Sequence, residues 1–213
     1  MRIVTKGICH AYVPGSWVLK DVNLTIEVGE TVAIMAPSGA GKTTLLSILG
    51  GLTNPSAGRV TWGEAQRLTQ RDLATTVGWI FQTANVLGTR TTVENVALGL
   101  YGQGASRQKA ESRASDMLGV VGLDHMGRRR ANSLSGGELQ RLVVARALAG
   151  ARALVLADEP TAQLDAATSE TVVDAIFRAR KSTTTLLMAT HDPAVAERCD
   201  RRLDLRNGQV FDV

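Results

Sequence analysis

The segment APSGAGKTT, at residues 36–44, constrains the fold more than any other part of the sequence. It follows an apolar run at residues 32–35 and precedes a helix-like run at residues 45–49. A strand, a glycine loop and a helix in this order are typical of a P-loop, whose backbone N–H groups surround phosphates while a lysine and a hydroxyl complete the site. The helix start adds unpaired N–H groups and the positive end of its dipole. The segment therefore predicts a nucleoside triphosphate site.

The residues of this predicted phosphate site are consecutive: Ser38, Gly39, Ala40, Gly41, Lys42, Thr43 and Thr44. Ala36 departs from the pattern, because a glycine usually stands there, and an alanine would be strained if the backbone needed a positive φ. The alternative interpretation is a plain glycine-rich turn, which the lysine and two threonines disfavour. A P-loop alone does not choose among kinases, GTPases, motors and transport ATPases. Other motifs have to make that choice.

Length and composition fit one globular domain, or one domain with an inserted lobe, since the chain has 213 residues of which 44% are hydrophobic. No stretch approaches the roughly 18 apolar residues of a membrane helix, and the first residues lack the apolar core of a signal peptide. The 24 Lys and Arg against 20 Asp and Glu give only +4, and aromatic residues are 4% of the chain. This mild charge and the scarcity of aromatic platforms argue against nucleic-acid binding.

Two smaller features receive structural interpretations. Arg128, Arg129 and Arg130 form the one dense basic run, which we interpret as a solvated loop, with anionic lipid headgroups or an acidic loop of a partner as the alternative. Cys9 and Cys199 lack CxxC spacing, so we expect two reduced, inert thiols and no metal cluster.

The order of elements indicates an antiparallel edge that leads into a parallel core. A turn at residues 14–16 separates two runs that read as strands, a hairpin is expected at Gly29-Glu30, and residues 87–132 have helical character. The strands expected from apolar and β-branched runs are residues 1–13, 17–28, 31–35, 59–62, 75–81, 153–157 and 182–189. The predicted fold class is therefore α/β, with a helical lobe inserted into the sheet domain.

A second anion site is predicted at LSGGELQR, residues 134–141. Ser135 and Glu138 have the spacing of a capping box, which predicts a helix start beside Gly136 and Gly137. Farther along, Asp158 and Glu159 end a buried strand, at the edge where open α/β sheets bind their ligands.

With these motifs in this order, the chain resembles the ATP-binding subunits of ABC transporters over almost its whole length. LSGGELQR resembles the signature sequence of that family, and Asp158-Glu159 its Walker B segment. Residues 161–165 look like the D-loop, although Ala162 and Gln163 stand where glycine and asparagine are frequent. His191 fits the switch histidine of the family. Gln82, after a strand, resembles its Q-loop glutamine.

The resemblance implies ATP and Mg²⁺ as cofactors and assigns roles to single residues. Lys42 would contact the β- and γ-phosphates, and Thr43, Gln82 and Asp158 would hold the ion. Glu159 would be the general base and His191 would hold the γ-phosphate. In trans, Ser135, Gly136, Gly137 and Glu138 would cover the ATP of a second subunit in a two-fold dimer, for which the expected partner is an identical chain. Tyr12 is the candidate for stacking on adenine, and Trp17 competes for that role.

The same resemblance predicts the role of the chain as an ATPase that drives a membrane transport complex. Residues 1–86 and 133–213 would form the ATPase core, and residues 87–132 the helical subdomain that docks a permease on a separate chain or chains, at the cytoplasmic face of the membrane. The sequence around Gln82 and residues 92–98 looks like the lipoprotein-release and macrolide-export branch. The end of the chain soon after residue 210 leaves no room for a regulatory domain, which favours efflux over import.

Two alternatives from other classes remain at this point. One is a soluble ABC ATPase of DNA repair or translation. Repair ATPases of this family usually contain a coiled-coil or zinc insertion, and translation factors usually contain two ATPase units, and neither feature is evident in the sequence. The other is a membrane subunit that regulates cell-wall enzymes without transport, which would have the same ATPase chemistry.

Overall fold

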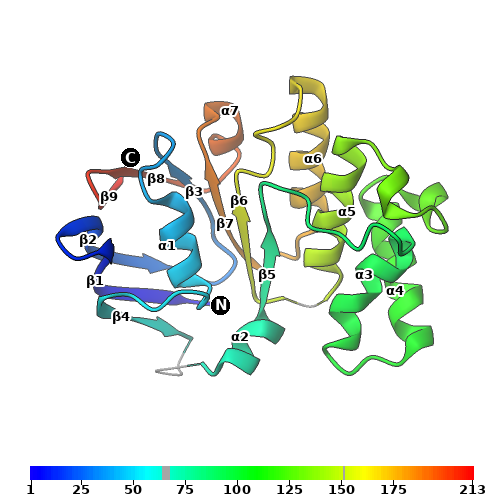
Figure 1. Cartoon of the computed structure of the whole chain (residues 1–213), viewed down its shortest axis with the longest axis horizontal. Helices are drawn as coiled ribbons and strands as arrows, with labels where there is room; N and C mark the ends of the chain where they lie inside the picture. The colour runs from blue at the N-terminus through cyan, green and yellow to red at the C-terminus, as the bar shows by residue number, and fades with distance from the viewer. Residues whose placement is uncertain (64–67, 151) are drawn as a thin grey trace.

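The computed structural model describes residues 1–63, 68–150 and 152–213, and it folds around two β-sheets (Figure 1). The smaller sheet has three strands in the order β2-β1-β4, and the larger has six in the order β5-β6-β7-β3-β8-β9. Helices cover the larger sheet, so the predicted α/β class is confirmed.

The small sheet is antiparallel and comes mostly from the start of the chain. β1 (Ile3–Val13) lies between β2 (Ser16–Ile26) and β4 (Ala57–Trp62), and Ile3 pairs with a residue in each neighbour. The predicted hairpin at Gly29-Glu30 is wrong, because β2 and the next strand belong to different sheets. The turn instead carries the chain from one sheet to the other, and a Cβ on Gly29 would lie 2.3 Å from the Ser182 carbonyl oxygen.

The large sheet is parallel in β5 (Val77–Ile80), β6 (Leu154–Asp158), β7 (Thr185–Thr190), β3 (Thr31–Met35) and β8 (Arg201–Arg206), and β9 (Gln209–Asp212) adds an antiparallel edge. β3 sits between β7 and β8. β6 and β7 are buried along their whole length, as expected for strands covered on both faces.

Helix α1 (Lys42–Leu49) packs between the two sheets. Its Leu45, Leu46, Ile48 and Leu49 are fully or almost fully buried in one hydrophobic cluster with residues of both sheets. A helix buried on several sides is a rigid support, because its surroundings are close-packed and cannot shift without loss of contacts. The loop before α1 is therefore held between β3 and a helix that both sheets enclose.

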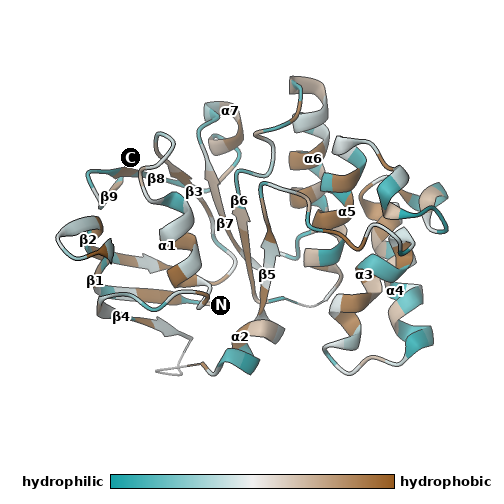
Figure 2. Cartoon of the chain, in the orientation of Figure 1, coloured by the Kyte–Doolittle hydropathy of each residue, from teal (hydrophilic) through white to brown (hydrophobic). Residues whose placement is uncertain are grey.

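The helical part lies on the other side of the large sheet. α3 (Thr92–Tyr101) and α4 (Arg107–Val120) pack on α5 (Gly136–Ala149), and α6 (Ala166–Ala179) packs on α5 in turn. Two short helical turns, Asp124–Met126 and Ala131–Ser133, follow α4. Figure 2 shows the hydrophobic sides of α3, α5 and α6 turned inward and the polar sides of α4 outward. A second hydrophobic cluster joins these helices to β6 and β7.

Several boundaries differ from those expected. Residues 75 and 76 belong to α2 (Gln70–Thr76), which starts at a capping box between Thr69 and Asp72, so the expected strand shortens to β5. The sequence did not indicate α6, α7 (Pro193–Ala196), β8 or β9. Arg128, Arg129 and Arg130 are exposed, as expected of a solvated loop. None of the helices among the described residues has the length and apolar character of a membrane span.

Candidate active site

The P-loop joins the end of β3 to the start of α1. Gly41 caps the helix in the left-handed region with φ 104°, and a Cβ there would lie 2.8 Å from Cγ1 of Val18. Both the backbone conformation and the close packing therefore require glycine. Ala36, in contrast, has a negative φ, so the alanine at this position carries no backbone strain.

Lys42 points into the loop rather than into solvent. Its Nζ donates to the carbonyl oxygens of Ala36, at 2.6 Å, and of Pro37, at 3.3 Å, and lies 3.1 Å from Oε1 of Glu159. The side chain of Lys42 is 6% exposed and that of Glu159 is 13% exposed. The ammonium is thus held in place by two carbonyl dipoles and one carboxylate in a site with little solvent, where an ion pair is screened weakly.

Thr43 and Asp158 meet at the base of the site. The hydroxyl of Thr43 donates to Oδ2 of Asp158 at 2.7 Å, and Oδ1 of the same carboxylate is buried without a hydrogen-bond partner among the described residues. Burial raises the pKa of Asp158, and the charge of Glu159 raises it further, against the opposing bond from Thr43. A hydroxyl and a carboxylate with a free oxygen are the donors that a hard divalent cation takes, so the pair fits Mg²⁺.

Glu159 also contacts His191. Nδ1 of His191 and Oε2 of Glu159 are 2.9 Å apart, so the two oxygens of this carboxylate face Lys42 and His191 separately. Glu159 has a positive φ of 46°, which is uncommon for a residue with a Cβ, and its amide donates to the Ala189 carbonyl at 2.9 Å. Strained backbone of this kind clusters at functional sites. The positions of these two side chains follow from the adjacent ends of β6 and β7.

Lys42, Thr43, Glu159 and His191 line one open cavity of about 450 Å³, and Asp158 lies beside it, hydrogen-bonded to Thr43. The cavity lining combines the P-loop with residues from five other segments: Tyr12, Val18, Ser38, Gly39, Gly41, Lys42, Thr43, Thr44, Gln82, Glu159, Ala162 and His191. The sequence analysis singled out Tyr12, and the hydroxyl of this residue lies 3.1 Å from Oγ1 of Thr44. Trp17 is 48% exposed and is absent from this lining.

The second predicted anion site lies elsewhere in the chain. Ser135 caps α5 through the Glu138 amide, and the Glu138 carboxylate accepts from the Ser135 amide at 2.7 Å and from its hydroxyl at 2.9 Å. These bonds lower the pKa of Glu138. Gly137 is in close contact with α6, because a Cβ on it would lie 2.3 Å from Cγ2 of Thr168. Ser135, Gly136 and Gly137 do not line the cavity of Lys42.

Gln140, which no sequence motif indicated, links α5 to the segment before Gln82. This side chain is 4% exposed, and its Nε2 donates to the carbonyl oxygen of Phe81 at 3.1 Å. The available signal was its helical spacing from Val143, Val144 and Ala147, which places Gln140 on the apolar face of α5, where a buried amide needs a partner. Val18 was also missed, since nothing in a strand pattern indicates that one of its side chains reaches a P-loop.

Comparison with known proteins agrees with the motifs. The sequence matches the ABC transporter family over residues 19–162. The lipoprotein-releasing system ATP-binding protein LolD of Granulibacter bethesdensis is 42% identical over 91% of this chain and 87% of its own length. The macrolide export ATP-binding/permease protein MacB of Pectobacterium atrosepticum is 41% identical over 91% of this chain, which spans only 31% of that longer protein.

Solved structures of ATP-binding cassettes have the same fold over almost the whole chain. A dimeric post-hydrolysis state of an ATP-binding cassette bound to ADP and Pi matches with a TM-score of 0.88 and 33% identity, over 99% of this chain and 97% of the other. A dimeric bacterial ABC transporter cassette matches with a TM-score of 0.86 and 34% identity, over 98% and 96%.

The P-loop fold and its cavity define a nucleoside triphosphatase, and the family match narrows this class to the ATPases of ABC transporters. This chain belongs to the ABC transporter family. It is an ATPase of the cassette type, and the prediction of an ATP-hydrolysing subunit of an ABC transport complex is confirmed.

Proposed function

We propose that this chain hydrolyses ATP at the cytoplasmic face of the membrane to drive a permease on one or more separate chains, in the direction of export. The observation that supports the chemistry best is that Lys42, Thr43, Glu159 and His191 line one cavity. The hydroxyl of Thr43 joins Asp158 to this group through a hydrogen bond. The direction follows from the relatives, two of which are named for lipoprotein release and macrolide export.

In the proposed reaction the P-loop binds the phosphates of ATP. Backbone N–H groups of residues 38–44 surround them, and Lys42 leaves Glu159 to contact the β- and γ-phosphates. Thr43, Asp158 and Gln82 would hold Mg²⁺, which neutralises charge on the phosphates when bound. The free Oδ1 of Asp158 supports this assignment, because a buried carboxylate oxygen without a partner costs stability until a ligand satisfies it.

Glu159 is the proposed general base. Its carboxylate accepts a proton from water while the water oxygen attacks the γ-phosphorus, and the bond from that phosphorus to the bridging oxygen breaks to leave ADP and phosphate. His191 lies 2.9 Å from the carboxylate and is placed to orient it and to contact the γ-phosphate. Phosphoryl transfer needs positioning and charge stabilisation rather than covalent catalysis, and Lys42, Glu159 and His191 together provide both.

The proposed functional unit is a two-fold dimer of this chain. Ser135, Gly136, Gly137 and Glu138 present the N-terminus of α5 outside the Lys42 cavity, so they fit the phosphates of ATP bound to a second subunit. Dimeric cassettes among the structural relatives support the same arrangement. ATP would favour the closed dimer because only that state contacts the γ-phosphate from both chains.

The proposed permease-docking part is residues 87–132, and residues 1–86 and 133–213 form the proposed ATPase core. Gln82 lies at the cavity and precedes α3 in the chain, so it connects the docking part to the reaction site. The bond from Gln140 to the Phe81 carbonyl supports this connection, since it ties α5 to the backbone next to Gln82.

Affinity capture of the tagged chain from gently solubilised membranes, with mass spectrometry of every retained protein, tests this proposal. We expect a permease among the retained proteins. The control is the same capture of the tagged chain from a strain that lacks that permease. A captured permease with the features of a cell-wall enzyme regulator would replace transport with signalling. Retention of ribosomes, DNA or soluble factors alone would refute the transporter assignment.

A further inference from the structure

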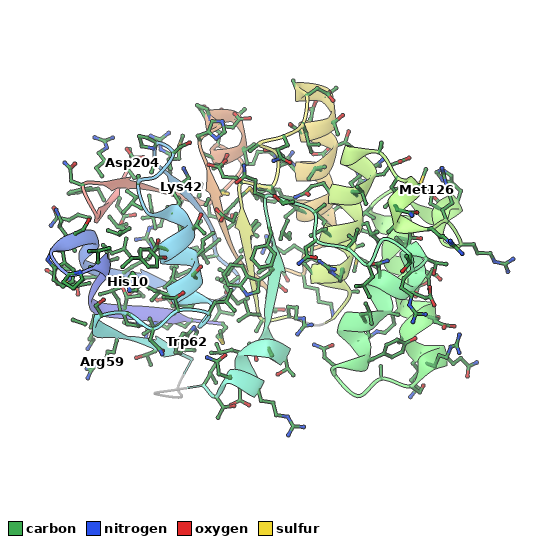
Figure 3. All side chains as sticks on the ribbon, in the orientation of Figure 1. His10, Lys42, Arg59, Trp62, Met126 and Asp204 are labelled. Atoms are coloured by element: carbon green, nitrogen blue, oxygen red, sulfur yellow. The ribbon has the colours of Figure 1, made fainter. Side chains whose placement is uncertain are left out.

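His10 is a polar residue without a polar environment. It lies on β1, is 7% exposed, and neither ring nitrogen has a hydrogen-bond partner within residues 1–63, 68–150 and 152–213. Figure 3 shows it on the side of the small sheet that faces α1. Native proteins contain few buried polar atoms of this kind, and each calls for a physical explanation.

The contact that His10 does make is with Tyr12. The two ring centroids are 4.7 Å apart and the ring planes stand at 84°, an edge-to-face geometry that is favourable for aromatic pairs. Both side chains come from the same strand two positions apart, so they lie on the same face of the sheet. Tyr12 is 66% exposed and therefore has few other neighbours to fix its ring.

The other end of Tyr12 is fixed as well. Its hydroxyl lies 3.1 Å from Oγ1 of Thr44, a P-loop residue that is 6% exposed. The exposed ring is thus held by a buried ring at one side and by a buried hydroxyl at its tip, at the mouth of the phosphate cavity. A surface aromatic held in this way loses little conformational entropy when a flat ligand stacks on it.

We propose that His10 is a positioning residue that fixes the ring of Tyr12 as a platform for the purine base of the nucleotide. This inference rests on the proposed stacking role of Tyr12 and extends it to a residue that does not itself touch the ligand. The observed contact of the His10 ring is with the ring of Tyr12, whereas the P-loop at Thr44 is reached by the Tyr12 hydroxyl, so we expect His10 to affect binding of the base rather than of the phosphates.

Binding of two ligands separates this role from a merely structural one. In the wild-type chain, His10→Ala should weaken ATP binding about threefold to tenfold by calorimetry, because an aromatic pair contributes a factor of that size. Binding of inorganic tripolyphosphate, which has no base, should stay unchanged. His10→Phe keeps the ring and removes the two unpaired nitrogens, so it should restore ATP binding and fold at least as stably as the wild type.

A double-mutant cycle completes the test. If His10 acts through Tyr12, then adding His10→Ala to Tyr12→Ala causes no further loss of ATP affinity. Equal weakening of ATP and tripolyphosphate by His10→Ala, or the same loss in both backgrounds, overturns the inference and leaves a structural role. If Tyr12→Ala leaves ATP affinity unchanged, the proposed stacking role of Tyr12 itself is wrong, which is a separate failure from that of His10.

Discussion

Replacing Glu159 by glutamine should make this protein bind ATP more tightly and hydrolyse it more slowly. In the structure, Nζ of Lys42 is 3.1 Å from the Glu159 carboxylate, and both side chains are largely shielded from solvent. ATP has to compete with this carboxylate for the ammonium. A glutamine keeps the shape of the side chain but removes the charge, so the competition weakens before ATP arrives.

The size of the effect follows from the contact. Hydrogen bonds to charged groups contribute about 1.5–3 kcal/mol, and a neutral amide oxygen retains part of this. A loss of about 1.4 kcal/mol of competition corresponds to roughly tenfold tighter ATP binding. Hydrolysis should fall by about 100-fold to 10,000-fold, because the amide cannot accept a proton from water. An ATP-bound dimer should therefore accumulate.

Calorimetry with ATP and size-exclusion chromatography with light scattering measure the two effects. Glu197→Gln is the matched control, since it removes one exposed carboxylate that does not line the cavity. An ATP affinity equal to that of the wild type would refute the competition between ATP and Glu159. A mutant that stays monomeric with ATP, or that hydrolyses ATP at the wild-type rate, would refute the assignment of the base.

Five further substitutions test other parts of the site. Lys42→Ala should weaken ATP binding at least about tenfold, and an unchanged Kd by calorimetry would contradict the P-loop assignment. Tyr12→Ala should weaken ATP binding more than Trp17→Ala, and the reverse order would move base stacking to Trp17. Burial raises the pKa of Asp158 in the folded state, so the folded protein binds this proton more readily than the unfolded chain does. The stability owed to this group therefore rises as the pH falls through the folded pKa toward the lower, ordinary pKa of the unfolded chain. Asp158→Asn should accordingly raise the thermal midpoint of the nucleotide-free protein at pH 7 by about 2–4 °C while stopping hydrolysis, and a lowered midpoint would contradict that sign. Gln140→Leu should lower kcat about fivefold with KM for ATP unchanged, because it removes the bond to the backbone beside Gln82, and a wild-type kcat would argue against that link.

Local signals were sufficient wherever one short segment contains the whole interaction. The capping box of Ser135 and Glu138 forms as the spacing predicts, and the P-loop joins β3 to α1 as expected, because a cap or a tight turn depends on neighbours in the chain. The positions of the site motifs were predictable from the sequence because each motif directly follows a strand or starts a helix.

Sequence signals failed where a helix signal and a strand signal compete for the same residues, and where a residue contacts another that is distant in the sequence. Thr75 and Thr76 have β-branched side chains that favour a strand, but both belong to α2, which begins at the Thr69–Asp72 capping box. β8 carries several charged residues, and its Arg201 pairs with Asp212 on β9, so its pattern is not that of a buried strand. No sequence pattern indicates that Glu159 pairs with Lys42, because that contact depends on the alignment of β6, β7 and β3.

The order of strands in the large sheet also has a consequence for synthesis of the chain. β3 delivers the P-loop, yet its two neighbours, β7 and β8, come from residues 185–190 and 201–206. A nascent chain that has reached only the P-loop cannot pair β3 on either side, so the nucleotide site forms only after residues 201–206 have left the ribosome. Fragments that end before β7 should therefore neither bind ATP nor engage a second subunit, and translation makes this ATPase competent only once β7 and β8 have been synthesised.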